Sequence, residues 1–308
     1  MSARRMEPGL LALAATFLLM PAAQAATGKL VLTGGITSVE GTAGGGITPW
    51  AMIGTQATEN EWGVSASSSF TETDDYRLNT YGVAAAWNER VEFSLAQQRF
   101  DTGITGTALT GSDLVLEQHI IGAKVRVLGE AVLDADTWMP QVSVGVQHKR
   151  LDANALEPTL QALGARRSGT DVYVSATKLF LAPGILVNTT LRATNANQNG
   201  LLGFGARLGG DESRHQLVPE VSVAKLLRNN LAVGMEYRAM PNKLARAGQA
   251  AGLGNGLAAD DWKDVFIAWA PHKQLSLTAA YVDLGRIVPA TTNNRDQRGI
   301  FVSAQIAF

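Results

Sequence analysis

The chain has 308 residues, with 26 Lys and Arg against 27 Asp and Glu, a formal net charge of -1 and no cysteine. This near-neutral charge argues against a nucleic-acid partner. Without cysteine the protein can form neither disulfides nor thiolate metal sites, and we expect no metal and no other cofactor.

The N-terminal segment has the pattern of a secretory signal. Arg4 and Arg5 precede an apolar run over residues 10–20, and Ala23-Gln24-Ala25 follows as a small-residue cleavage site. The run is shorter than the ~20 residues that span a membrane, which disfavours an anchoring helix. We predict a signal peptide over residues 1–25 and one domain over residues 26–308.

Glycines interrupt the next part of the chain and leave two alternatives open. Residues 29–37 and 47–57 could both be strands, but glycine pairs and triplets weaken that assignment. If both segments belong to the wall of a barrel, we count about 14 strands. If residues 26–48 instead fold inward as a plug, 12 strands remain.

The rest of the chain alternates apolar and polar residues in runs of about ten. In residues 90–100, for example, Val91, Phe93 and Leu95 alternate with polar residues. Further runs cover residues 139–149, 171–180, 185–194, 217–226, 231–239, 264–269, 274–282 and 299–308. This period of two over that length is typical of strands that cross a membrane. We predict an all-β fold: a transmembrane antiparallel up-and-down β-barrel in the outer membrane of a Gram-negative bacterium.

The connections between these runs alternate in length. Short, turn-forming ones occur at residues 88–89, 182–184, 228–230 and 271–273. Long ones cover about residues 101–113, 151–168, 195–214, 241–261 and 285–297. Outer-membrane barrels have short periplasmic turns and long outer loops, so we assign the short connections to the periplasm.

Aromatic residues mark the short-turn end of the predicted strands. Five of them fall on the apolar side of their strands: Trp62, Trp138, Phe180, Trp269 and Phe308. Such a row predicts a girdle at one membrane interface. Trp87 lies at the same height, but its facing stays open. Phe308, a terminal aromatic in an alternating strand, resembles the assembly signal that the barrel-assembly machinery reads.

Several short segments resemble a known family. They are Asp74-Asp75-Tyr76-Arg77-Leu78, Thr177-Lys178-Leu179-Phe180-Leu181, Leu201-Leu202-Gly203-Phe204-Gly205, Ala280-Tyr281-Val282-Asp283-Leu284-Gly285 and Asp296-Gln297-Arg298-Gly299. The chain is similar over nearly its whole mature length to a bacterial domain-of-unknown-function family of exported outer-membrane β-barrel proteins. The resemblance implies no assigned activity and supplies no functional residues.

Charged residues on the inward side of the strands are the main candidate site. Seven form the predicted lumen cluster: Arg192, Glu220, Glu236, Arg238, Glu92, Lys124 and Arg126. Arg77, Lys149, Asp171 and Asp264 have the same parity. A turn at residues 228–230 places Leu227 opposite Leu231 and Glu220 opposite Arg238. Such charges could form a salt-bridged, closed interior or line a polar pore.

Three outward polar residues raise the possibility of lipid chemistry. With Val127 facing Trp138, Glu117 would lie opposite His148, and His119 opposite Val146. A carboxylate beside imidazoles can do acid-base work. No serine is placed as a nucleophile, however, so we assign no catalytic residue and expect contacts to lipopolysaccharide head groups instead.

The function that this pattern favours is passage of small solutes through the outer membrane, as a channel or facilitated transporter. The alternative is a closed structural or surface-interaction barrel, and a lipid-modifying enzyme is the least favoured reading. We expect no enzyme activity. The expected partners are outer-membrane lipids, lipopolysaccharide, the barrel-assembly machinery and a small solute that the sequence does not identify.

Overall fold

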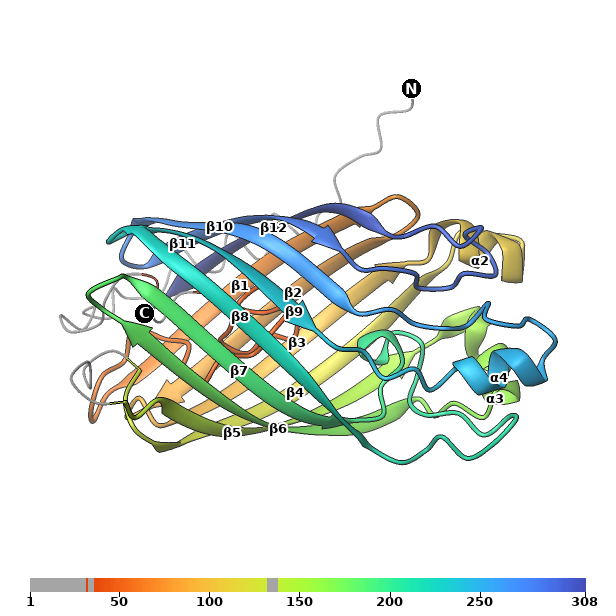
Figure 1. Ribbon diagram of the computed structural model, residues 1–308, viewed down its shortest axis with the longest axis horizontal. Helices are drawn as coiled ribbons and strands as arrows, with labels where there is room; N and C mark the ends of the chain where they lie inside the picture. Colours follow the sequence, from red (N-terminus) through yellow and green to blue (C-terminus); the bar gives the residue numbers. More distant parts are fainter. Residues whose placement is uncertain (1–31, 33–35, 132–137) are drawn as a thin grey trace, which may run out of the picture.

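A computed structural model describes residue 32, residues 36–131 and residues 138–308 of the chain. These residues form a closed antiparallel β-barrel in which each strand pairs with its sequence neighbours and β1 pairs with β12 (Figure 1). The signal peptide predicted over residues 1–25 lies outside the described residues.

Twelve strands make up the wall. They are β1 (Trp62–Thr73), β2 (Arg77–Trp87), β3 (Val91–Asp101), β4 (Val115–Leu128), β5 (Gln141–Asp152), β6 (Ser168–Phe180), β7 (Ile185–Thr194), β8 (Gln216–Arg228), β9 (Leu231–Arg238), β10 (Trp262–His272), β11 (Leu275–Asp283) and β12 (Arg298–Ala307). The all-β, up-and-down topology predicted from the alternation is confirmed.

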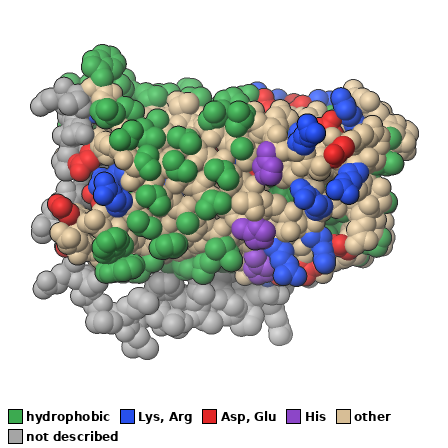
Figure 2. Space-filling view, turned by 90° about the horizontal axis from the view of Figure 1, so that it is seen from below, with side chains coloured by type: hydrophobic (Ala, Val, Ile, Leu, Met, Phe, Trp, Pro, Cys, Tyr) green, Lys and Arg blue, Asp and Glu red, His purple; other side chains and the backbone are tan. Residues whose placement is uncertain are grey.

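Alternation decides which side chains face outward. In β3, Phe93 and Leu95 are 56% and 54% exposed, whereas Glu92 and Ser94 between them are buried. The same alternation in the other strands places apolar side chains on the outer face, where they form an apolar band (Figure 2). Such a band around a polar interior is the surface that a membrane barrel presents to lipid.

The two ends of the barrel differ, as the connection lengths predict. Tight turns and the C-terminus lie at one end, which we call the turn end (Figure 1). Longer loops at the other, the loop end, contain α2 (Gly103–Thr110), η1 (Asn154–Leu156), α3 (Glu157–Ala162), η2 (Gln198–Gly200) and α4 (Ala245–Ala250).

Aromatic side chains surround the turn end. Trp62 and Trp138 are 70% and 89% exposed. Trp87, whose facing the sequence left open, points outward beside Trp62, with 6.2 Å between the ring centroids. Trp138 packs edge-on against Phe180. The predicted girdle is therefore present.

The count of 14 strands is wrong, because residues 36–57 lie inside the barrel. We call this segment the plug; every residue in it is buried. Glycines permit its close approach to the wall: a Cβ on Gly45 would lie 2.0 Å from Glu236 Oε1. The predicted strand over residues 47–57 is thus plug, as in the 12-strand alternative. Of the alternative plug range 26–48, residues 26–31 and 33–35 lie outside the described part.

Loops close the lumen at the loop end. The β7–β8 connection folds inward, and all of residues 195–206 are buried. Leu201 and Leu202 pack in an apolar cluster with Trp262 of β10 and with loop residues such as Leu284 and Ile287. The lumen is therefore filled by the plug in its middle and by this loop cap at the loop end.

Candidate functional site

Glu40 of the plug is fully buried among three cations of the wall. Its carboxylate accepts hydrogen bonds from Lys149 Nζ at 2.5 Å and from Arg238 Nη2 at 3.1 Å. Arg192 donates to both carboxylate oxygens, at 3.1 Å and 2.8 Å. Bidentate, charge-assisted hydrogen bonds between arginine and a carboxylate are strong. A single acidic side chain thus joins the plug to β5, β7 and β9.

Two acids of the wall complete this group. Asp171 lies 2.8 Å from Lys149 and 3.4 Å from Arg192, while Glu220 lies 2.5 Å from Arg192 and 3.7 Å from Arg238. We call the six residues the central network: Glu40, Lys149, Asp171, Arg192, Glu220 and Arg238. It contains three acids and three bases, so the formal charges cancel. Cancellation matters because an uncompensated buried charge costs several kcal/mol.

A second contact joins the plug to β3 and β4. Glu92 and Lys124 form a buried ion pair at 3.2 Å. Glu92 also accepts hydrogen bonds from Thr42 Oγ1 at 2.6 Å and from the Gly54 amide at 2.7 Å. Lys124 donates to the Ala43 carbonyl at 3.2 Å. Both partners of the ion pair therefore hold the plug as well as each other.

A third contact involves two carboxyl groups. Glu236 of β9 lies opposite Asp264 of β10. Glu236 accepts hydrogen bonds from the Ile47 amide at 2.8 Å, from Ser222 Oγ at 2.8 Å and from Thr48 Oγ1. Within the described residues neither carboxylate forms an ion pair with Lys or Arg. The plug is held here by amide and hydroxyl donors instead.

Neutral side chains of the wall bind the plug backbone directly. The Pro49 carbonyl accepts hydrogen bonds from Thr190 Oγ1 at 2.8 Å and from Asn188 Nδ2 at 3.2 Å. The Ala51 carbonyl accepts one from Gln141 Nε2 at 2.7 Å. Buried backbone groups need such partners. The polar wall therefore supplies the hydrogen bonds that water would otherwise make.

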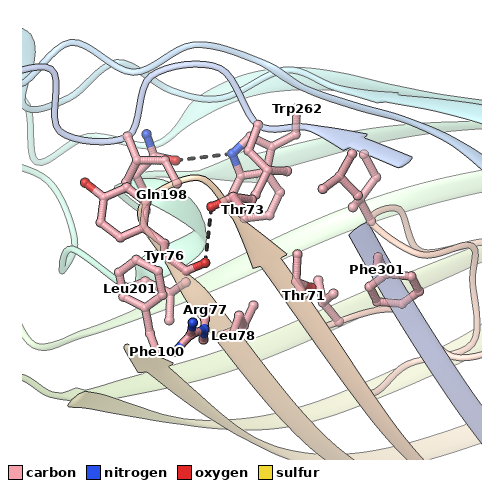
Figure 3. Close-up of a pocket in the computed structure, with 15 residues that line it drawn as sticks. Thr71, Thr73, Tyr76, Arg77, Leu78, Phe100, Gln198, Leu201, Trp262 and Phe301 are labelled. Carbon is pink, nitrogen blue, oxygen red and sulfur yellow. Dashed lines mark hydrogen bonds between the residues drawn. The ribbon is translucent and has the colours of Figure 1, made fainter. Parts of the chain in front are cut away.

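A small cavity of about 30 Å³ remains between the plug and the loop cap (Figure 3). Its lining is mostly apolar and aromatic, with Tyr76, Phe100 and Trp262 around it. Trp262 Nε1 donates to Gln198 Oε1 at 3.2 Å, which ties the cap to the wall. A space of this size holds a water molecule but not a sugar or an amino acid. The lumen is closed in this conformation.

The central network contains three of the seven charged residues predicted to line the lumen: Arg192, Glu220 and Arg238. Glu220 lies opposite Arg238 in the pairing of β8 with β9, as the register predicts. The prediction is wrong nearer the turn, where Arg228 and not Leu227 lies opposite Leu231. A bulge adds one residue there and leaves the register at the network unchanged.

Three of the other four line the lumen at the second and third contacts: Glu92, Lys124 and Glu236. Arg126 does not lie with them, because it sits at a bulge near the turn end of β4 and pairs with Glu89 at 4.0 Å and Glu130 at 3.6 Å. Arg77 is on the outer face, paired with Glu72 at 2.7 Å, because the outward positions of β2 are the odd ones.

Sequence reasoning missed Glu40, although a signal for it exists. Glu40 is the only charged residue between Lys29 and Glu59. A lone acid in a glycine-rich, otherwise uncharged segment needs a cationic partner if that segment is buried. The inward cations of the predicted strands were the available partners.

The predicted pairing of outward residues on β4 and β5 is wrong. His119 lies opposite Arg150 and not opposite Val146, a shift of four residues. Glu117 is consequently not opposite His148. The cause is a longer connection between the strands, so that pairing starts further along β5, with Leu128 opposite Val142. A bulge in β4 takes back one residue of this shift. Near the loop end of the outer face lie Glu117, His119, His148 and Arg150.

The sequence matches a family model described as "Protein of unknown function (DUF3034)" over residues 33–305. No curated protein matches the chain.

Solved structures of outer-membrane barrels resemble the fold. The NanC porin has 8% identity and a TM-score of 0.50, and the match covers 80% of this chain and 100% of that one. The KdgM porin has 9% identity and a TM-score of 0.48, covering 79% and 99%. Outer membrane phospholipase A from Escherichia coli has 9% identity and a TM-score of 0.42, covering 79% and 92%. At such identities the likeness to NanC shows a shared porin-type barrel fold and nothing about a solute.

Proposed function

We propose that this chain, which belongs to the DUF3034 family of proteins of unknown function, is an outer-membrane channel for small polar solutes that the plug holds closed. The apolar outer band and the aromatic girdle support a location in the outer membrane. The loop end would then face outside and the turn end the periplasm.

The observation that carries the proposal is the chemistry between plug and wall. The plug is bound by ion pairs and by hydrogen bonds from side chains such as Gln141, Asn188 and Thr190. Water can replace every one of these partners when the plug moves. After the plug leaves, water can hydrate the polar side chains of the wall. A channel for polar solutes requires a polar lumen of this kind.

The charge of the wall suggests a selectivity for the open state. Without Glu40, the central network would keep Lys149, Arg192 and Arg238 against Asp171 and Glu220, which is three positive charges against two negative. This leaves a net charge of +1 at that height. We infer a weak preference for anions, because charged rings of a pore tune its selectivity.

A closed structural barrel is the second candidate. The balanced central network and the apolar loop cap favour it, since the cavity between the plug and the cap measures about 30 Å³. The two candidates differ in whether the plug can leave the lumen without unfolding the barrel.

A reversible cross-link distinguishes them. Thr48 Oγ1 lies 2.6 Å from Ser222 Oγ, and the native chain has no cysteine, so the double variant Thr48→Cys, Ser222→Cys can form one defined disulfide between plug and wall. When the disulfide is reduced, we expect the plug to leave the lumen transiently, so that the refolded protein conducts in a planar bilayer. When it is oxidised, the plug stays in place and we expect no conductance.

The single variant Thr48→Cys is the control, because it should conduct under both conditions. If neither redox state of the double variant conducts, and deletion of residues 36–57 leaves a folded barrel that also does not conduct, the channel proposal is wrong and the closed barrel is favoured.

A further inference from the structure

A cationic patch lies on the outer face of the barrel near the loop end. Register places His119 of β4, Arg150 of β5 and Ser168 of β6 in one row across three strands. His148 and Thr170 lie in the next row toward the turn end, with His148 Nδ1 3.0 Å from Thr170 Oγ1. Two imidazoles, a guanidinium and two hydroxyls are therefore close together on the outer surface.

The arginine of this patch differs from two other arginines on the outer face of the strands. Arg77 pairs with Glu72 at 2.7 Å and Arg298 with Asp283 at 3.1 Å. Arg150 is exposed and forms no ion pair with any residue that the structure describes. Its guanidinium can therefore accept an anion from outside the protein, in the bidentate geometry that suits phosphate.

In the described strands, the carboxylates nearest this patch in register lie on its loop-end side. Glu117 lies further toward the loop end and pairs with Arg99 at 3.4 Å. Asp152 is the next outward residue of β5 in the same direction. Neither lies between the patch and the apolar band.

The patch meets the apolar band on its other side. Ile121, Val146 and Val172, one or two outward positions toward the turn end, are 61%, 40% and 46% exposed. Figure 2 shows exposed histidines between the apolar band and a group of Lys and Arg side chains. A ligand that fills this surface needs an anionic head and apolar chains.

We infer that this patch binds a phosphorylated lipid of the outer leaflet, such as the lipid A part of lipopolysaccharide. Arg150 binds the phosphate, His119 and His148 donate further hydrogen bonds, and the acyl chains lie along Ile121 and Val172. The inference rests on the outer-membrane location proposed above but not on conduction, so it can be tested without the channel.

Native mass spectrometry of the folded full chain in detergent tests the inference, with lipid A and its dephosphorylated form as probes. We expect the variant Arg150→Gln, His148→Gln to retain about tenfold less lipid A, as expected for loss of a charge-assisted hydrogen bond. The control Arg77→Gln removes a paired arginine from the same face and should bind like the native protein. Heat-modifiable gel mobility verifies that each variant is folded.

Three results would overturn the inference. One is equal retention of lipid A by the double variant. Another is equal binding of the dephosphorylated lipid, which would leave only an apolar contact. The third is complete displacement of lipid A by inorganic phosphate, which would indicate a site for the free anion.

Discussion

Arg192 binds Glu40 through two hydrogen bonds, of 3.1 Å and 2.8 Å, at a point where both side chains are fully buried. The arginine belongs to the wall and the glutamate to the plug. This pair therefore links the wall directly to the plug.

Removing the carboxylate of Glu40 should weaken the plug. In Glu40→Gln the central network keeps three cations and two anions, and breaking a buried ion pair of this kind costs about 3 to 5 kcal/mol. Because the strand ladders stay intact, we expect the plug to leave while the barrel remains folded. Conductance should rise above that of the native chain. Glu59→Gln, at an exposed position of the turn end, serves as the control and should change nothing.

The sign of the lumen charge should depend on Arg238. In the reduced Thr48→Cys, Ser222→Cys channel, adding Arg238→Glu changes the wall of the central network from +1 to -1, since one positive charge becomes one negative charge. Reversal potentials in a salt gradient should then shift toward cation selectivity. Arg77→Glu makes the same change of charge on the outer face, and an equal shift there would contradict a role for the central network.

Phe308 should affect assembly more than final stability. Its backbone pairs with Val64 on β1 through hydrogen bonds of 2.8 Å and 3.1 Å, and the half-buried residue lies at the turn end of the barrel. In Phe308→Ala those backbone bonds remain, so we expect slower membrane insertion with unchanged secretion. Heat-modifiable gel mobility of outer-membrane fractions measures this. Phe308→Tyr, which keeps an aromatic ring, should insert at the native rate.

Acid should loosen two loops at the loop end, those between β9 and β10 and between β11 and β12. The hydrogen bond from Arg286 lowers the pKa of Asp260, with bonds of 2.6 Å and 2.8 Å to its two oxygens. A lowered pKa means that the pair supports the loops above the ordinary Asp value of about 3.9, and that this support is lost as the pH falls through the lowered value.

Cleavage by an acid-active protease measures this effect. As the pH falls through the lowered pKa of Asp260, the rate of cleavage within residues 239–261 should increase in the native chain. The variant Asp260→Asn lacks the titrating group, so the ratio of the native rate to the variant rate should rise. A constant ratio of the two rates would show that the ion pair does not hold these two loops together.

The sequence by itself determined the wall of this protein. Strand formation depends on a period of two and on turn chemistry, both local properties, so runs such as residues 171–180 and 185–194 could be placed from the chain alone. The same period decides which side chains point into the lumen. For this reason Glu220 and Arg238 could be paired across a short turn. Between β4 and β5 the connection is longer than the sequence suggested, and the predicted register was wrong by four residues.

Only the tertiary structure decided what fills the lumen. The alternation of residues 47–57 suits a strand, but their backbone binds side chains from many strands that are far apart in sequence. No local pattern encodes those distant partners. Glu40 shows the physical reason most clearly: a buried carboxylate is stable only where cations surround it, and Lys149, Arg192 and Arg238 meet only once the barrel has closed.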